Sequence, residues 1–276
     1  MQEEIIRNWE FHGLGPKTPI QIGRGEKQVT VWCHTPKKWN EYSPVIFVMH
    51  GVKRNARKYH HAWIGHAERH NFLLLVPEFS QQHYPGRRGY NLGNILSPSG
   101  NPHAEDKWAY TAIEELFDAV QTIMVFRTNT YRIYGHSAGA QFVHRLTLFL
   151  PDARIDTAIC ANAGWYTFPW YANRFPYGLM DSGITEADLK KAFGKRVIVL
   201  LGDNDTNPHH KYLKQSTLAK RQGANRYERG INFYQAAKRE AARLQVPLNW
   251  ELRIVPGVGH HHRKMATAAV NNGWIA

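Results

Sequence analysis

Apolar runs of strand length alternate with helical patterns along this chain, and the alternation strongly limits the folds open to it. Residues 43–49 and 72–76 are almost continuously apolar, as expected of central parallel strands covered on both faces. Apolar residues recur at three- and four-residue steps over residues 113–124, which predicts a helix with one apolar stripe. Further strand-like runs lie at residues 130–134, 157–160 and 196–201. The pattern predicts an α/β fold around a parallel sheet.

The two ends of this series look different from its middle. Every second residue is apolar in residues 248–254, which predicts the last strand of the sheet, with one face in water. Residues 28–33 predict an antiparallel strand near the start. Because no linker separates two cores, we expect a single domain over residues 1–276. It would include an N-terminal strand or arm at residues 1–28 and an aromatic-rich loop or small lid at residues 165–195.

The charge balance of the chain is strongly basic. Thirty-five Lys and Arg residues face 22 acidic ones, a net charge of +13, and such a surface attracts polyanions. The basic residues are scattered and match no nucleic-acid-binding motif, so we expect a solvated basic surface and no specific nucleic acid partner. No apolar run is long enough to span a membrane, and the chain opens on acidic residues. We therefore expect a cytoplasmic protein, or a secreted or periplasmic one if a signal peptide has been removed; nothing indicates an oligomeric state.

Residues 135–139 read Gly-His-Ser-Ala-Gly and stand between a predicted strand and a predicted helix. Glycines on both sides of a serine permit a tight, strained turn that projects the hydroxyl from the end of the strand. The motif in this position predicts a nucleophile elbow, with Ser137 as the nucleophile.

A serine hydroxyl needs a general base, and the base needs a carboxylate that orients it. Asp203 and Asp205 follow a buried strand at its carboxyl end, where sheets of this type place their sites. Three histidines, residues 260–262, follow the last predicted strand. The order serine, aspartate, histidine fits a catalytic triad, with either aspartate and any of the three histidines as candidates.

With these three motifs in order, the chain resembles the α/β-hydrolase family from about residue 29 to residue 275. Residues 50–55, His-Gly-Val-Lys-Arg-Asn, together with residues 161–166, Ala-Asn-Ala-Gly-Trp-Tyr, look most like the poly(3-hydroxybutyrate) depolymerase and feruloyl esterase group. The resemblance implies a mostly parallel sheet of about eight strands with helices on both faces. It also selects Asp205 as the acid and His260 as the base.

The tetrahedral intermediate of acyl transfer needs backbone N–H donors at its oxyanion. Ala138 supplies one, because it follows the nucleophile at the start of a helix. By resemblance to the family's His-Gly-x motif, Val52 supplies the other. A strand-ending turn without this role is the alternative for residues 50–52.

Seven aromatic residues crowd into residues 165–177, after a strand whose end should lie beside Ser137. Aromatic residues this dense on a loop either bind a ligand or pack over the core as a lid. We expect Trp165, Tyr166 and Trp170, together with His136 of the elbow, to bind substrate.

No metal or organic cofactor is expected. His66 and His70 are four residues apart, but Glu68 is not placed as zinc-protease motifs require. No glycine-rich dinucleotide or phosphate motif occurs.

The sequence therefore predicts a serine hydrolase that cleaves carboxylic esters through an acyl-Ser137 intermediate. The ester would carry an apolar or aromatic group, polyhydroxyalkanoate-like or feruloyl-like, and could be small or polymeric. A serine peptidase or thioesterase would use the same triad. A non-catalytic, basic polyanion-binding protein on the same fold is a further alternative.

Overall fold

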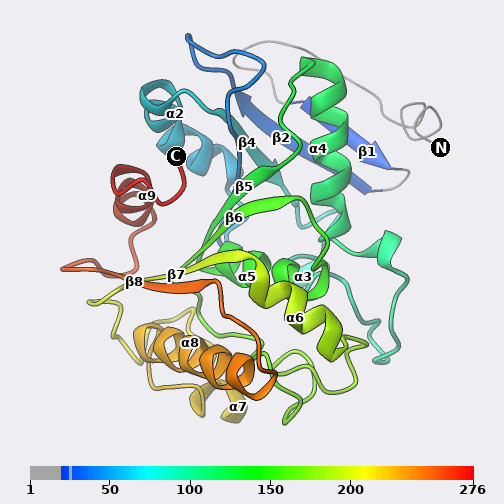
Figure 1. The fold of residues 1–276 in the computed structure, drawn as a ribbon, viewed down its shortest axis with the longest axis vertical. Coiled ribbons are helices and arrows are strands. Elements are labelled where there is room, and N and C mark those ends of the chain that lie inside the picture. Colours follow the sequence, from blue (N-terminus) through cyan, green and yellow to red (C-terminus); the bar gives the residue numbers. More distant parts are fainter. Residues whose placement is uncertain (1–19, 25–26) are drawn as a thin grey trace.

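The structure, a computed structural model, describes residues 20–24 and 27–276, and its strands form one sheet (Figure 1). The sheet order is β1-β2-β4-β3-β5-β6-β7-β8. β1 and β2 pair antiparallel, β2 pairs antiparallel with β4, and all pairs from β4 to β8 are parallel. The strands are β1 (Ile20–Arg24), β2 (Lys27–His34), β3 (Val45–Met49), β4 (Leu73–Glu78), β5 (Tyr131–His136), β6 (Ile155–Ala161), β7 (Arg196–Gly202) and β8 (Trp250–Val255).

Helices cover both faces of the sheet. They are α2 (Ala56–His70), α3 (Gly86–Gly89), α4 (Thr111–Met124), α5 (Ala138–Phe149), α6 (Glu186–Gly194), α7 (Thr217–Lys220), α8 (Arg226–Arg243) and α9 (His262–Asn271), with a short 3₁₀ helix at Glu105–Lys107. One hydrophobic core lies between the sheet and α4, α5, α6 and α8, and a second lies under α2 and α9. α2 and α9 lie side by side on their face (Figure 1).

The continuous apolar runs are explained by these two cores. In β3, Phe47 and Met49 belong to the first core, whereas Ile46 and Val48 belong to the second. Because side chains alternate across a strand, a strand covered on both faces must be apolar at every position. The prediction of a mostly parallel α/β fold with helices on both faces is confirmed.

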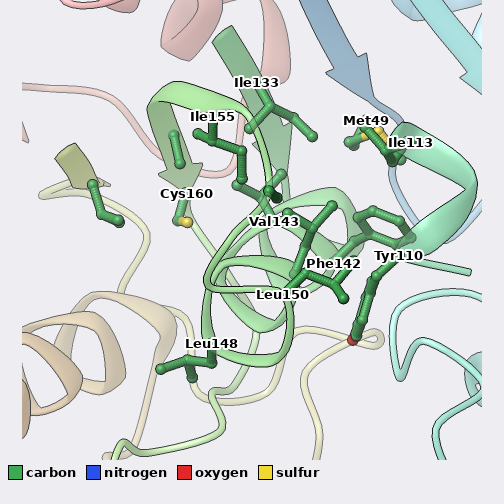
Figure 2. Packing of buried hydrophobic residues seen from close by; sticks show 14 of the residues in the cluster. Met49, Tyr110, Ile113, Ile133, Phe142, Val143, Leu148, Leu150, Ile155 and Cys160 are labelled. Atoms are coloured by element: carbon green, nitrogen blue, oxygen red, sulfur yellow. The ribbon is translucent and has the colours of Figure 1, made fainter. Parts of the chain in front are cut away.

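Helix α5 is buried along its whole length. It packs on β5 and β6, and Phe142 contacts Tyr110, with ring centroids 4.9 Å apart (Figure 2). Such packing leaves the residue that precedes α5 little freedom to move. The site described below begins at that residue.

The structure describes the predicted N-terminal region only in part. Residues 1–19 and 25–26 of the predicted N-terminal region lie outside the described residues, and β1 and β2 occupy the adjoining positions. The predicted loop or lid at 165–195 is irregular up to residue 185 and ends in α6, whose start carries a capping box from Thr185 and Asp188. The single domain over residues 1–276 stays a prediction.

In residues 20–24 and 27–276, no helix has the length and apolar character needed to cross a bilayer.

Candidate active site

Ser137 lies in a tight turn between the end of β5 and the start of α5. Its backbone has φ 59° and ψ −113°, a strained conformation for a residue with a side chain. The Ser137 N–H donates to the carbonyl of Ala161 at 2.9 Å, and its carbonyl accepts from the N–H of Gln141 at 3.1 Å. The turn is therefore tied both to the neighbouring strand β6 and to the first turn of α5.

The glycines on either side of Ser137 are required by close backbone contacts. A Cβ atom at Gly135 would lie 2.2 Å from the carbonyl oxygen of Gly139. A Cβ atom at Gly139 would lie 2.2 Å from the carbonyl oxygen of Met49, at the end of β3. No side chain fits at either position, so the turn can press against β3 and hold Ser137 at the carboxyl edge of the sheet.

Asp205 and His260 meet at the same edge. Asp205 stands three residues beyond β7 and is 3% exposed, and His260 lies in the loop between β8 and α9. The Nδ1 atom of His260 is 2.6 Å from Oδ2 of Asp205. Because a carboxylate accepts, we assign the proton to Nδ1, which leaves the lone pair on Nε2.

Asn162 joins the loops that carry these two residues. Its Oδ1 accepts from the Gly202 N–H at 2.8 Å, and its Nδ2 donates to the Gly259 carbonyl at 3.2 Å. A Cβ atom at Gly202 would lie 2.1 Å from the Val258 carbonyl oxygen, so the strand end and the histidine loop are in direct contact. The sequence analysis used Asn162 only as part of a motif and did not foresee this role.

Asp203, the alternative acid, has a different partner. Its Oδ1 accepts from the Gly257 N–H at 2.7 Å, in the turn that leads to His260. Asp203 therefore shapes the histidine loop, whereas Asp205 contacts the imidazole. Both carboxylates follow the same strand, and Asp205, which the family resemblance selects, is the one that contacts the imidazole.

Arg226, at the start of α8, controls the charge around Asp205. It is 1% exposed, and its Nη1 donates to Oδ1 of Asp205 at 3.2 Å while its Nη2 donates to Nδ1 of His210 at 2.9 Å. Burial lowers the pKa of His260 below its ordinary value of 6.5; the Asp205 hydrogen bond partly opposes this shift, and the charge of Arg226 adds to it. His260 is therefore neutral at pH 7 and able to accept a proton. No motif pointed to Arg226 in the sequence.

A cavity of about 110 Å³ opens beside Ser137. Its wall includes Ala138 and Val52, the two residues expected to donate to an oxyanion, as well as Trp165. The remaining lining residues, which the sequence analysis did not assign to a site, are Arg87, Asn91, Gln141, Gly164, Lys211, Tyr212, Leu213 and Lys214.

The loop that carries Val52 is anchored by buried polar groups. The His50 carbonyl accepts from the Tyr90 hydroxyl at 2.7 Å, and Nε2 of His50 accepts from the Phe79 N–H at 3.2 Å. Burial lowers the pKa of His50 to about 3, so the ring stays neutral and can accept. Arg54 donates to the carbonyls of Phe79, Tyr84 and Gly86. These bonds hold the loop against the sheet edge.

The residues expected to bind substrate do not all reach the cavity. Trp165 lines it. Tyr166 is fully buried and stacks on Phe233, with ring centroids 4.4 Å apart, and Trp170 packs on Phe168 at 4.7 Å. Tyr166 is therefore part of the core, and the partly buried Trp170 packs against it, because a large ring buried there removes more apolar area from water than one at a pocket wall.

His136, the fourth residue expected to bind substrate, is buried next to His260. Its ring centroid lies 4.5 Å from that of His260, and burial holds its pKa well below the ordinary range. Its Nδ1 is 3.5 Å from the Tyr59 hydroxyl. A neutral ring in this position packs against His260 without bringing a positive charge next to it.

No cofactor or metal site stands out beside this centre. In the described part of the chain, no group of three or more His, Cys, Asp or Glu side chains is arranged to hold a metal ion. His66, one of the spaced pair in α2, has its Nε2 3.4 Å from the Thr267 hydroxyl.

Comparisons with known proteins extend the description of the fold and site. Neither a scan of family models nor a search of curated proteins gave a match. Among solved structures, poly(aspartic acid) hydrolase-1 from Sphingomonas sp. KT-1 is 37% identical, with a TM-score of 0.89 over 93% of this chain and 98% of that one. LpqC, a poly(3-hydroxybutyrate) depolymerase from Bordetella parapertussis, is 34% identical, with a TM-score of 0.88 over 92% and 88%. Est1E from Butyrivibrio proteoclasticus, at 16% identity and a TM-score of 0.56 over 92% and 96%, shares the fold.

Proposed function

Because the chain belongs to the α/β-hydrolase family and is an esterase-like hydrolase, we propose that it cleaves carboxylic esters through an acyl intermediate on Ser137. One observation carries the proposal. The strained serine turn and the Asp205–His260 pair, joined at 2.6 Å, stand at the ends of β5, β7 and β8, on the same edge of one sheet. That arrangement is what nucleophilic acyl transfer requires.

In the first half of the reaction, Nε2 of His260 accepts the hydroxyl proton as Ser137 Oγ attacks the ester carbonyl. Negative charge then develops on the carbonyl oxygen, and the N–H groups of Val52 and Ala138 donate to it. His260 next gives its proton to the leaving alkoxide, so the C–O bond breaks and an alcohol departs. In the second half, His260 activates a water, which releases the acid and restores Ser137.

Asp205 orients His260 and stabilises the imidazolium that forms in each half-reaction. Arg226 holds the carboxylate from its other side. The buried carboxylate of Asp205 thus has one partner on each side, His260 at Oδ2 and Arg226 at Oδ1.

The cavity favours a short acyl unit. Its volume of about 110 Å³ is well below the roughly 300 to 1,000 Å³ of pockets that enclose drug-sized ligands. Trp165 supplies an apolar face beside Ser137. We therefore favour a polyhydroxyalkanoate-like ester, whose repeating units enter one at a time, over a feruloyl-like one.

Amide hydrolysis is a second candidate, and one observation favours it. The solved structure at 37% identity is named a poly(aspartic acid) hydrolase, and poly(aspartic acid) is a polyamide. The same triad serves amides, provided that His260 protonates the leaving amine.

Labelling with a fluorophosphonate tests the proposal. The reagent should modify Ser137, identified by mass spectrometry of the labelled peptide, and Ser137→Ala should abolish both labelling and hydrolysis of a p-nitrophenyl ester. A loss on the order of 10⁴-fold or more is typical when a nucleophile is removed. Labelling that survives the substitution, or that maps to another serine, would overturn the assignment. Matched oligoester and oligoamide substrates decide between the two bond types.

A further inference from the structure

All charged side chains in the wall of the Ser137 cavity are basic. They are Arg87 and Lys211, which are exposed, and Lys214, which is half-buried. Within residues 20–24 and 27–276, none of the three forms an ion pair with a carboxylate. Nζ of Lys211 lies 5.1 Å from the centre of the Tyr212 ring, and this contact does not neutralise its charge. Among the described residues, the cavity wall therefore presents three cations without a carboxylate partner.

A second layer of positive charge stands directly behind this wall. Arg145 and Arg229 are fully buried. The guanidinium of Arg145 lies 4.4 Å from the ring of Trp165, and Nη1 of Arg229 donates to the Gly164 carbonyl at 2.7 Å, so each arginine contacts a lining residue. The Nη2 atom of each has no hydrogen-bond partner in the described part of the chain.

Among the described residues, no carboxylate forms an ion pair with either arginine of this inner layer, although the charge of the exposed Glu228 acts on Arg229. Asp205 is the one acidic residue among the buried side chains that the structure describes, and it is paired with Arg226. Burial lowers the pKa values of Arg145 and Arg229 to about 10, so both remain charged at neutral pH. Charges in a wall of low dielectric constant are screened less than surface charges, and they raise the potential in the cavity.

We propose that the preferred substrate of this site is an anionic oligomer, with a carboxylate on the repeating units beside the scissile bond. The inference rests on the proposed function, because an acyl bond in a chain of diacid units leaves one carboxylate free on each unit. Lys211, Lys214 and Arg87 would bind these carboxylates at the cavity mouth while the scissile carbonyl lies at Ser137. Each contact is a charge-assisted hydrogen bond, which is stronger than its neutral counterpart. The net charge of +13 would draw such a chain to the enzyme.

Two matched trimers test the proposal. One is a trimer of 3-hydroxybutyrate; the other is a trimer of malate linked through its β-carboxyl group, which has the same backbone with a carboxylate in place of each methyl. At low ionic strength we expect kcat/KM to be about tenfold or more higher for the malate trimer, through a lower KM. The preference should shrink as salt is added, because salt screens charge attraction.

A matched pair of double variants locates the effect. Lys211→Ala/Lys214→Ala should reduce the malate-to-butyrate ratio of kcat/KM by about tenfold. Lys38→Ala/Lys190→Ala removes the same charge from exposed positions outside the cavity wall, in the connection before β3 and in α6, which precedes β7. This control should leave the ratio within about twofold. An equal decrease of the malate-to-butyrate ratio in both double variants would show that the overall positive charge of the surface causes the preference, and it would overturn the proposal.

A binding measurement separates this inference from the proposed function. In the Ser137→Ala background, calorimetry should detect the malate trimer, with at least tenfold weaker binding when Lys211 and Lys214 are also replaced. Equal kcat/KM for the two trimers, with fluorophosphonate labelling of Ser137 intact, would reject the anionic substrate and leave the proposed function standing. Absent labelling with specific malate binding would reject the proposed function alone. Binding of a short single-stranded DNA as tightly as the malate trimer would reject carboxylate recognition.

Discussion

The proposed reaction centre of Ser137, Asp205 and His260 and the aromatic segment, residues 165–177, are built on opposite principles. Ser137 of the first and Trp165 of the second line the same cavity. Around Ser137, two glycines allow backbones to come within distances that no side chain would permit. In the aromatic segment, large rings fill space, and Tyr166 packs on Phe233 inside the core. A position where only glycine fits indicates one backbone geometry, such as the turn at Ser137. An aromatic ring indicates no single place, because it can be buried at many points of the core or at a pocket wall. We therefore expect substitutions in the first region to affect chemistry and substitutions in the second to affect stability.

The largest expected effect separates the two acids near the reaction centre. Asp205→Asn should lower kcat by about 10⁴-fold, because an amide cannot hold His260 in the required tautomer. It should also lower stability, since buried Arg226 loses its carboxylate. Asp203→Asn should lower kcat by less than about tenfold, because it weakens only the hydrogen bond to the Gly257 N–H of the loop backbone. Steady-state kinetics on one ester compare the two variants, and the opposite order would reassign the acid to Asp203.

Two adjacent residues of the aromatic segment, Trp165 and Tyr166, should respond differently to substitution. Tyr166→Ala should destabilise the protein by about 3–5 kcal/mol, the usual range for a fully buried ring, and leave the chemistry of the folded fraction intact. Trp165→Ala should reduce kcat/KM for a long or aromatic ester by about tenfold relative to an acetyl ester, because its ring lines the cavity. Urea denaturation and an ester panel measure the two effects. A change of ester preference in Tyr166→Ala would show that Tyr166, and not only Trp165, contacts the substrate.

Two glycines offer a smaller contrast in stability. Gly139→Ala should lower the free energy of unfolding by at least about 1–3 kcal/mol. The new Cβ would lie 2.2 Å from the Met49 carbonyl oxygen, so the backbone would have to shift. Gly65→Ala, in the middle of α2 with open space around the new Cβ, should stabilise the protein by up to about 1 kcal/mol. Thermal denaturation of both variants checks the signs. A stable, active Gly139→Ala protein would contradict the tight elbow.

The smallest effect concerns pH. Since burial lowers the pKa of His260 below 6.5, the base stays unprotonated to lower pH than an exposed histidine would. As the pH falls through that pKa, the imidazole takes up a proton and kcat/KM should drop about tenfold per pH unit. We therefore expect the half-maximum below pH 6.5, the ordinary pKa of a histidine. A half-maximum above pH 6.5 in a pH–rate profile would contradict the buried geometry.

The comparison between the two regions also explains which features were predictable. The strands could be located because burial on both faces leaves a local mark, an unbroken apolar run such as β3. The elbow could be located because only glycine permits its contacts. By contrast, Tyr166 and Trp165 are both aromatic, and their different surroundings depend on where α5 and α8 pass.

By itself, the sequence determined the α/β sheet, because strands and helices leave local patterns of apolar residues. It also supplied the proposed nucleophile and the chain order of the proposed acid and base, because each is recorded in a short stretch of residues. The family resemblance selected Asp205 as the acid, but its contact with His260 depends on tertiary structure, since the two residues are 55 positions apart and the packing of β7 against β8 brings them together. Tertiary structure also placed Arg145 and Arg229 behind the cavity without an ion-pair partner among the described residues, and Lys211 and Lys214 in its wall. Hydrophobic burial follows local periodicity, but the electrostatic surroundings of a group depend on every segment folded around it.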